Sequence, residues 1–195
     1  MPDQLRTVDL TPVERHPPIV GTTARPSAAG PQPTAPADGG AAGSAPAVRL
    51  EWRGEDDTRA FAAQLATHPA IAGAFIELHG DLGAGKTTFA RHLLRALGVR
   101  ERVKSPTYTV VEPHEAGPLQ IWHFDFFRFN DPHEWEDAGF RDIFAGPGLK
   151  LAEWPEKAMG LLPRADLVVH IEAQADESRR VTLLAQTPLG RELMT

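Results

Sequence analysis

The chain has 195 residues, no cysteine, a formal net charge of −6 and a sequence pI of about 5.7. The lack of cysteine excludes disulfides and thiolate metal sites and suits the reducing cytoplasm, where we expect the protein to act. The acidic balance argues against a protein that binds DNA or RNA unaided. No apolar stretch is long enough to span a membrane.

The start of the chain differs in composition from the rest. Residues 1–47 are rich in Pro, Ala, Gly and Thr and contain no aromatic residue, so they cannot bury enough apolar surface to offset chain entropy. They lack the basic start and apolar run of a secretory signal, and their prolines argue against the amphipathic helix of a transit peptide. We predict a disordered tail over residues 1–47 and one domain over residues 48–195.

The domain begins with two strands separated by a helix. The alternating run 48–52 predicts a short strand, and the mostly apolar run 74–79 predicts a buried one. Between them, Asp56 or Asp57 is expected to cap a helix that ends before Pro69. The apolar face of this helix is expected to hold Phe61, Ala62, Leu65 and Ala66.

The next segment is the most specific motif of the chain. From Gly80 to Thr87 the sequence GDLGAGKT matches the phosphate-binding pattern G-x-x-x-x-G-K-[ST] without a mismatch. Its glycines let backbone N–H groups turn toward an anion, and the following helix, which ends at Gly98, adds the positive end of its dipole. Lys86 is expected to reach the β/γ-phosphates and Thr87 to hold Mg²⁺. The order strand, loop, helix therefore predicts a nucleoside triphosphate site.

The rest of the domain predicts mainly strands. Asp131-Pro132 opens a short helix, with proline at its first position. Because few helices separate the later strands, we predict an α/β fold: a P-loop NTPase-like mixed β-sheet of about seven strands flanked by helices. The remaining predicted strands are residues 108–111, 119–124, 149–153, 167–171 and 181–185.

Two acids stand at the ends of predicted strands, where ligands gather in open α/β sheets. Asp125 follows the run 119–124 and could bind Mg²⁺ directly or through a water, as a Walker-B aspartate does; the alternative is an acid that caps the next turn. Glu153 could complete the Mg²⁺ shell or polarise the attacking water, although acids at strand ends are also common surface residues. Trp154, by residue type alone, is more typical of a core than of a ligand contact.

Residues 104–108, with the sequence KSPTY, form a third polar element. Pro106 holds Ser105 extended and cannot donate to a strand ladder. The hydroxyls of Ser105 and Thr107 suit a switch-like segment that senses the γ-phosphate, and the alternative is an ordinary strand entry.

Other polar residues carry weaker signals. The histidines, His123 and His133 among them, lack metal-ligand spacing and are interpreted as structural. A basic stretch forms either a solvated surface or a docking surface for an acidic partner or RNA. Its members are Arg91, Arg95, Arg100, Arg102 and Lys104.

Taken together, these motifs closely resemble the TsaE family of small bacterial P-loop ATPases, over nearly the whole chain from about residue 50 onward. One departure is Phe127, where the family usually has Tyr; a hydrogen bond from that hydroxyl is lost, while the packing of the ring is expected to survive. The resemblance rests on residues 80–88, 104–108, 123–125 with Arg128, and 153–155, in the family's order and spacing.

The resemblance implies a Mg²⁺-dependent ATPase subunit needed to form N6-threonylcarbamoyladenosine at position 37 of tRNAs that read codons beginning with A. It implies weak ATP hydrolysis, docking on a TsaB–TsaD complex with TsaC acting upstream, and contact with tRNA only through that complex. Thr87 and Glu153 become the expected Mg²⁺ ligands, and Lys86, Asp125 and Glu153 the expected catalytic residues. The expected nucleotide contacts are Asp81, Leu82, Gly83, Ala84, Gly85, Lys86, Thr87, Thr88 and Trp154.

Two other functions fit the phosphate-binding loop. A small-molecule kinase would need an Arg-bearing lid, and the stretch from Arg128 to Arg141 is short and partly apolar. A nucleotide-dependent binding module would use ATP to stabilise one conformation, with hydrolysis incidental. No Asn-Lys-x-Asp motif for guanine occurs. Thr58 and Arg179 could contact nucleotide, but helix capping or simple exposure is the preferred interpretation for Thr58.

Overall fold

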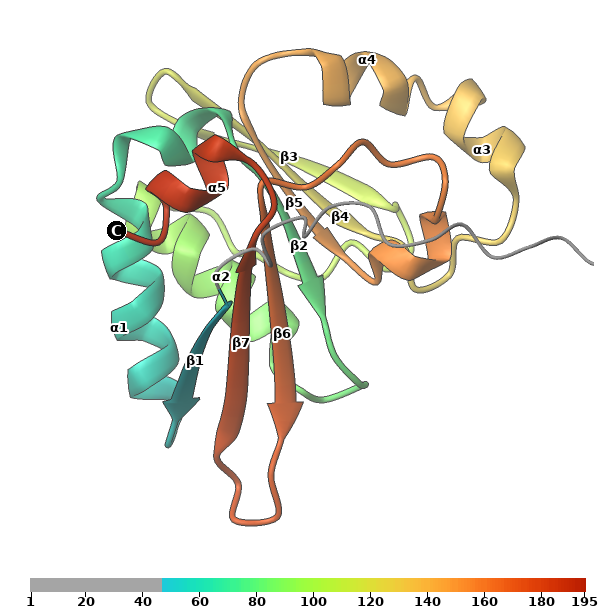
Figure 1. The fold of residues 1–195 in the computed structure, drawn as a ribbon. Helices are drawn as coiled ribbons and strands as arrows, with labels where there is room; N and C mark the ends of the chain where they lie inside the picture. The colour runs from blue at the N-terminus through green and yellow to red at the C-terminus, as the bar shows by residue number, and fades with distance from the viewer. Residues whose placement is uncertain (1–46) are drawn as a thin grey trace, which may run out of the picture. The chain divides into compact units, whose positions relative to one another are not determined.

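The computed structural model describes residues 47–195, so of the predicted tail only Ala47 lies within the described residues. Within this range a single seven-stranded sheet has the strand order β1-β7-β6-β2-β5-β4-β3 (Figure 1). The strands are β1 (Ala47–Trp52), β2 (Phe75–His79), β3 (Val111–Ala116), β4 (Leu119–Asp125), β5 (Leu149–Glu153), β6 (Leu167–Ala173) and β7 (Arg179–Ala185).

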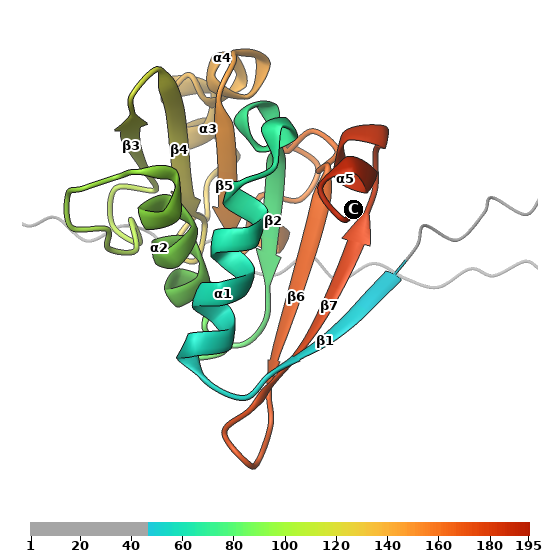
Figure 2. The same ribbon diagram turned by 90° about the vertical axis from the view of Figure 1, so that its left-hand side faces the viewer.

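Helices cover both faces of this sheet. In Figure 2, α1 and α2 lie against one face, and α3 and α4 lie against the other. No helix among residues 47–195 has the length and apolarity needed to cross a membrane. The α-helices are α1 (Glu55–Ala66), α2 (Lys86–Leu97), α3 (Pro132–Asp137), α4 (Phe140–Ala145) and α5 (Pro188–Glu192).

Alternation along β2 divides the apolar side chains between two cores. Ile76 and Leu78 are fully buried against the side of α1 and α2, whereas Phe75 points to the opposite face. The first core contains Phe89 of α2, and the predicted apolar face of α1 packs against it. The second core is aromatic and contains Phe124, Phe126, Trp135 and Phe140. Burial of these faces holds α1, α2, α3 and α4 on the sheet.

The centre of the sheet is parallel. β2 pairs in parallel with both β5 and β6, and β4 pairs in parallel with β5, whereas β1, β3 and β7 join antiparallel. The predicted mixed sheet is therefore confirmed. The register aligns Glu153 with Leu78 on one side and with Asp125 on the other. The carboxyl ends of β2, β4 and β5 consequently open at one edge, where ligands bind in α/β sheets.

Two local predictions are wrong. Residues 108–111 were expected to be a strand, but β3 begins only at Val111, because Val110 adopts a left-handed φ of 63° and donates its N–H to Pro106 across 2.7 Å. Neither acid caps α1 as expected: Gly54 occupies the N-cap position without a side-chain bond, and Asp57 accepts the N–H of Arg53 instead, at 2.8 Å. Asp131-Pro132 does open a helix, α3.

Candidate functional site

The phosphate-binding loop joins the end of β2 to the start of α2. Gly80 has a φ of 137°, and a Cβ there would lie 2.2 Å from the carbonyl oxygen of Ile171 in β6. Only glycine fits this position, because the obstacle is backbone. Gly85, with a φ of 113°, turns the chain into α2. The twelve residues of α2 direct the positive end of the helix at the loop.

Lys86 lies folded against its own loop. Its side chain is buried, and its Nζ donates to the carbonyl oxygens of Gly80 and Asp81, the latter at 2.9 Å. The same Nζ lies 3.8 Å from the ring centroid of Trp154. Burial lowers the pKa of Lys86, while the nearby carboxylate of Glu153 acts in the opposite direction. Its hydrogen-bond partners among the described residues are backbone carbonyls, so its charge remains available to an anion.

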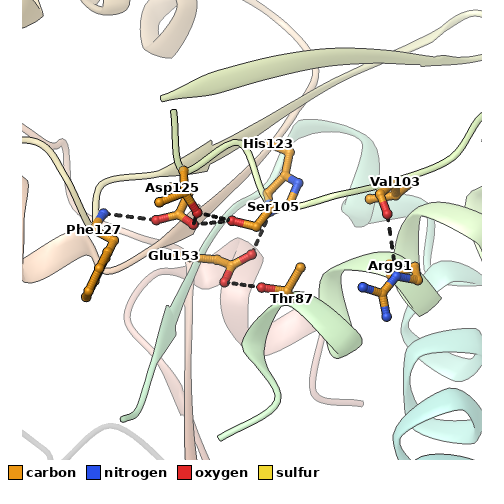
Figure 3. A network of polar contacts seen from close by, with 9 residues as sticks. Thr87, Arg91, Val103, Ser105, His123, Asp125, Phe127 and Glu153 are labelled. Atoms are coloured by element: carbon orange, nitrogen blue, oxygen red, sulfur yellow. Dashed lines mark hydrogen bonds and ion pairs between the residues drawn. The ribbon is translucent and has the colours of Figure 1, made fainter. Parts of the chain in front are cut away.

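Thr87 and His123 contact the two oxygens of Glu153. The Thr87 hydroxyl donates to Glu153 Oε2 across 2.8 Å, and His123 Nε2 lies 2.8 Å from Oε1. Figure 3 shows the carboxylate between these two side chains. Glu153 is only 2% exposed. Because Thr87 acts as the donor, its oxygen keeps lone pairs that a cation can use.

Asp125 accepts three hydrogen bonds at the end of β4. Its Oδ2 accepts from the hydroxyls of Ser105 and Thr107, the latter at 2.8 Å, and its Oδ1 accepts from the N–H of Phe127 at 2.9 Å. The bond to Phe127 is the turn-capping contact of the alternative interpretation. The two hydroxyl bonds fasten the 104–108 segment to the sheet beside Glu153 (Figure 3). Asp125 is thus an anchor as well as a cap.

Most of these residues line one cleft of about 340 Å³, whereas Gly80 and His123 lie outside its lining. Asp81 and Ala84, two expected nucleotide contacts, do not line it; Ala84 lines an adjoining hollow of about 190 Å³ together with Thr58 and Arg179. A larger hollow of about 650 Å³ borders β1 and contains none of the predicted site residues. The cleft is lined by Leu82, Gly83, Gly85, Lys86, Thr87, Thr88, Ser105, Thr107, Asp125, Phe127, Glu153 and Trp154.

Trp154 forms a wall of the cleft. It has a left-handed φ of 57°, a conformation that costs a non-glycine residue of order 1–3 kcal/mol. Its ring packs on Phe127 at a centroid distance of 4.9 Å, so the phenyl ring keeps a packing role without the Tyr hydroxyl. From β7, Arg179 Nε donates to the carbonyl oxygen of Ala84 across 2.9 Å and holds the loop from the other side.

Sequence reasoning missed the place of His123 in this site. We interpreted it as a structural histidine because no metal motif surrounds it, yet it is fully buried and bonded to Glu153. A signal was present, since His123 lies two residues before Asp125 and alternation places both on one face of the strand. His133 is exposed on α3. Of the basic stretch, Arg91 contacts the carbonyl oxygen of Val103 at 3.5 Å.

Comparisons with known proteins identify the family. The family model described as "Threonylcarbamoyl adenosine biosynthesis protein TsaE" matches residues 52–181. The chain belongs to the TsaE family. The resemblance predicted from the motifs is therefore confirmed.

TsaE relatives resemble this chain over most of their length. The protein "tRNA threonylcarbamoyladenosine biosynthesis protein TsaE" of Haemophilus influenzae is 45% identical over 132 residues, which are 68% of this chain and 81% of the relative. The Bacillus subtilis protein of the same name is 37% identical over 139 residues, 70% of this chain and 86% of the relative. The crystal structure of Bacillus subtilis YdiB superposes with a TM-score of 0.62 at 28% identity, covering 77% of this chain and 93% of YdiB.

Proposed function

We propose that this chain is a Mg²⁺-dependent ATPase subunit of the machinery that makes N6-threonylcarbamoyladenosine in tRNA. Membership of the TsaE family supports a role in this pathway, because the relatives are named tRNA threonylcarbamoyladenosine biosynthesis proteins. The pairing of Thr87 with Glu153 carries the proposed chemistry. It places a hydroxyl oxygen and a carboxylate, both ligands that Mg²⁺ prefers, beside a phosphate-binding loop.

The residues around the cleft fit a nucleotide with its cation. Within residues 47–195, the Lys86 ammonium contacts two backbone carbonyl oxygens and an aromatic ring, so a phosphate group can take over its donors. Thr87 and Glu153 are the proposed Mg²⁺ ligands, and Thr88 and the loop backbone are proposed phosphate contacts. Bound Mg²⁺ would neutralise charge on the β- and γ-phosphates and so favour phosphoryl transfer to water. Trp154 would hold the Lys86 side chain in place through the contact of its ring with Nζ.

Asp125 has a different proposed role. Its contacts hold Ser105 and Thr107 at the cleft lining, so it sets the position of the segment that would face the γ-phosphate. Its register with Glu153 puts two carboxylates on adjacent strand ends. Glu153 would bind the cation together with Thr87, and Asp125 would accept hydrogen bonds from water near it.

The rim of the cleft supports a protein partner. Leu82 and Phe127 line the cleft and are exposed, and Tyr108, which follows the lining residue Thr107, is 83% exposed. Large exposed apolar side chains gathered at one place are typical of interaction sites. We propose a TsaB–TsaD complex as the partner, with tRNA reached only through it. The same rim would serve a nucleotide-dependent binding module, in which ATP binding alone controls docking.

Calorimetry of ATP binding tests the site. Lys86→Ala should bind ATP at least tenfold more weakly, on the order of the loss of one charge-assisted phosphate contact. Lys157→Ala, which removes an exposed lysine outside the cleft, serves as the matched control. Glu153→Ala should lose Mg²⁺-dependent hydrolysis in the presence of the partners. Unchanged ATP affinity in Lys86→Ala would overturn the site, whereas a Glu153→Ala protein that binds ATP, hydrolyses none and still docks on its partner and supports formation of the modified nucleoside would favour the binding module.

A further inference from the structure

Two buried histidines lie behind Glu153. His123 of β4 and His114 of β3 are 0% and 2% exposed, and their ring centroids lie 6.4 Å apart. Each ring uses one nitrogen on a glutamate: His123 Nε2 lies 2.8 Å from Glu153, and His114 Nδ1 lies 2.8 Å from Glu101. Within residues 47–195, His123 Nδ1 and His114 Nε2 have no hydrogen-bond partner.

The unpartnered nitrogen fixes the hydrogen-bonding role of His123. A proton on Nδ1 would be a buried donor without an acceptor, which is costly. A neutral ring with its proton on Nε2 instead donates to Glu153 and leaves only a lone pair unpartnered. Glu153 then accepts one hydrogen bond on each oxygen, from His123 behind and from Thr87 in front.

We propose that His123 is a positioning residue, which holds Glu153 so that its Oε2 faces Thr87 and the cleft. This inference rests on the proposed function, in which Glu153 binds Mg²⁺. Without the bond to His123, the carboxylate could rotate away from Thr87, and Oε1 would lose its partner in a buried place. Partners that orient a metal-binding side chain typically change metal affinity about 10–100-fold when they are removed.

Two amide substitutions of His123 separate the effect of its hydrogen bond to Glu153 from the effect of a smaller side chain. In His123→Gln the amide nitrogen reaches about as far as Nε2 and can still donate to Glu153. In His123→Asn the amide nitrogen reaches only about as far as Nδ1 and cannot. The readout is Mg²⁺ affinity at saturating ADP, measured by calorimetry. His123→Asn should bind Mg²⁺ about 10–100-fold more weakly, and His123→Gln should recover most of that loss.

His114→Asn is the matched control. It changes the same residue type on the neighbouring strand, at similar burial, but the His114 ring contacts Glu101 rather than Glu153. It should lose stability to urea without losing Mg²⁺ affinity. Wild-type Mg²⁺ affinity in His123→Asn, or an equal loss in His114→Asn, would overturn the inference.

A second measurement does not depend on nucleotide binding or on variants that fold. The ¹⁵N shifts of the imidazole ring in the nucleotide-free wild-type protein report which nitrogen of His123 carries the proton. A proton on Nε2 supports the positioning role, and a proton on Nδ1 overturns it. Wild-type protein that binds no Mg²⁺–ADP would refute the proposed function instead, and the ring shifts would then decide the role of His123 alone.

Discussion

Substitution of Asp125 should release the 104–108 segment from the sheet. Asp125→Ala removes the acceptor of three donors: the hydroxyls of Ser105 and Thr107 and the N–H of Phe127. Hydrogen bonds to a charged group contribute about 1.5–3 kcal/mol each, and an orphaned buried donor costs about 1–3 kcal/mol. Ser105 and Thr107 stay 2.7 Å apart and can partly satisfy each other. We therefore expect the free energy of unfolding to fall by about 3–5 kcal/mol.

Asp125→Asn separates charge from shape. Its amide oxygen can keep the bond to Phe127, and its amide nitrogen can donate to the two hydroxyls, which then act as acceptors. Only the charge assistance is lost, so we expect a decrease of about 1–2 kcal/mol. Urea denaturation followed by tryptophan fluorescence measures both variants, and hydrogen exchange at Thr109 and Val110 reports the release of the segment.

Asp131→Ala is the control for this series. Asp131 is exposed and accepts a single backbone N–H at the start of α3, that of His133 at 2.9 Å, so its loss should cost about 0.5–2 kcal/mol. Asp125 would not anchor the segment if the free energy of unfolding of Asp125→Ala lay within about 1 kcal/mol of the wild-type value, or if hydrogen exchange at Val110 did not become faster.

Three further predictions concern the loop. Burial lowers the pKa of Lys86 in the folded protein below its ordinary 10.5. At pH values between the folded pKa and 10.5, the unfolded chain therefore binds more protons than the folded one, and the free energy of unfolding rises with pH. Lys86→Met should reduce the rise in the free energy of unfolding between about pH 8 and about pH 10, measured by urea denaturation of the variant and the wild type. An equal rise in both proteins would contradict this prediction. Gly80→Ala forces a Cβ to 2.2 Å from the Ile171 carbonyl and should cost about 2–4 kcal/mol in thermal or urea unfolding. Gly83→Ala, with a φ of 81° but no heavy atom within 4 Å, should cost only about 1 kcal/mol, and equal costs would refute the close-approach argument. Thr87→Val should weaken Mg²⁺ binding at saturating ADP about tenfold or more while Thr87→Ser retains it, and calorimetry showing no difference would remove Thr87 from the metal site.

The sequence predicts best where chemistry fixes local spacing. The loop from Gly80 to Thr87 and its flanking strand and helix were predicted because a phosphate needs that order of elements. Asp125 and Glu153 were placed at strand ends by the same reasoning. Their alignment as partners on adjacent strands depends on strand order, which pairs β4 with β5 across the 23 residues of intervening chain, 126–148, and is absent from any local pattern.

One failure traces to a contact between distant residues. Residues 108–111 have the composition of a strand, but Val110 turns to bond Pro106 while its carbonyl oxygen accepts the N–H of Asp125, at 2.8 Å. That pairing becomes visible only once β4 is in place. The contact of His123 with Glu153 could not be predicted for a similar reason, because it joins two strands. Local propensity is a weak guide where tertiary hydrogen bonds decide the backbone.

The pathway is tested most directly by nucleoside mass spectrometry of tRNA from cells depleted of this protein. We expect N6-threonylcarbamoyladenosine to fall on depletion, to return when the wild-type chain is supplied, and to stay low when Glu153→Ala is supplied. Normal levels of the modified nucleoside in depleted cells would contradict the proposed function. Full recovery by Glu153→Ala would keep the pathway but remove the metal site on which the account rests.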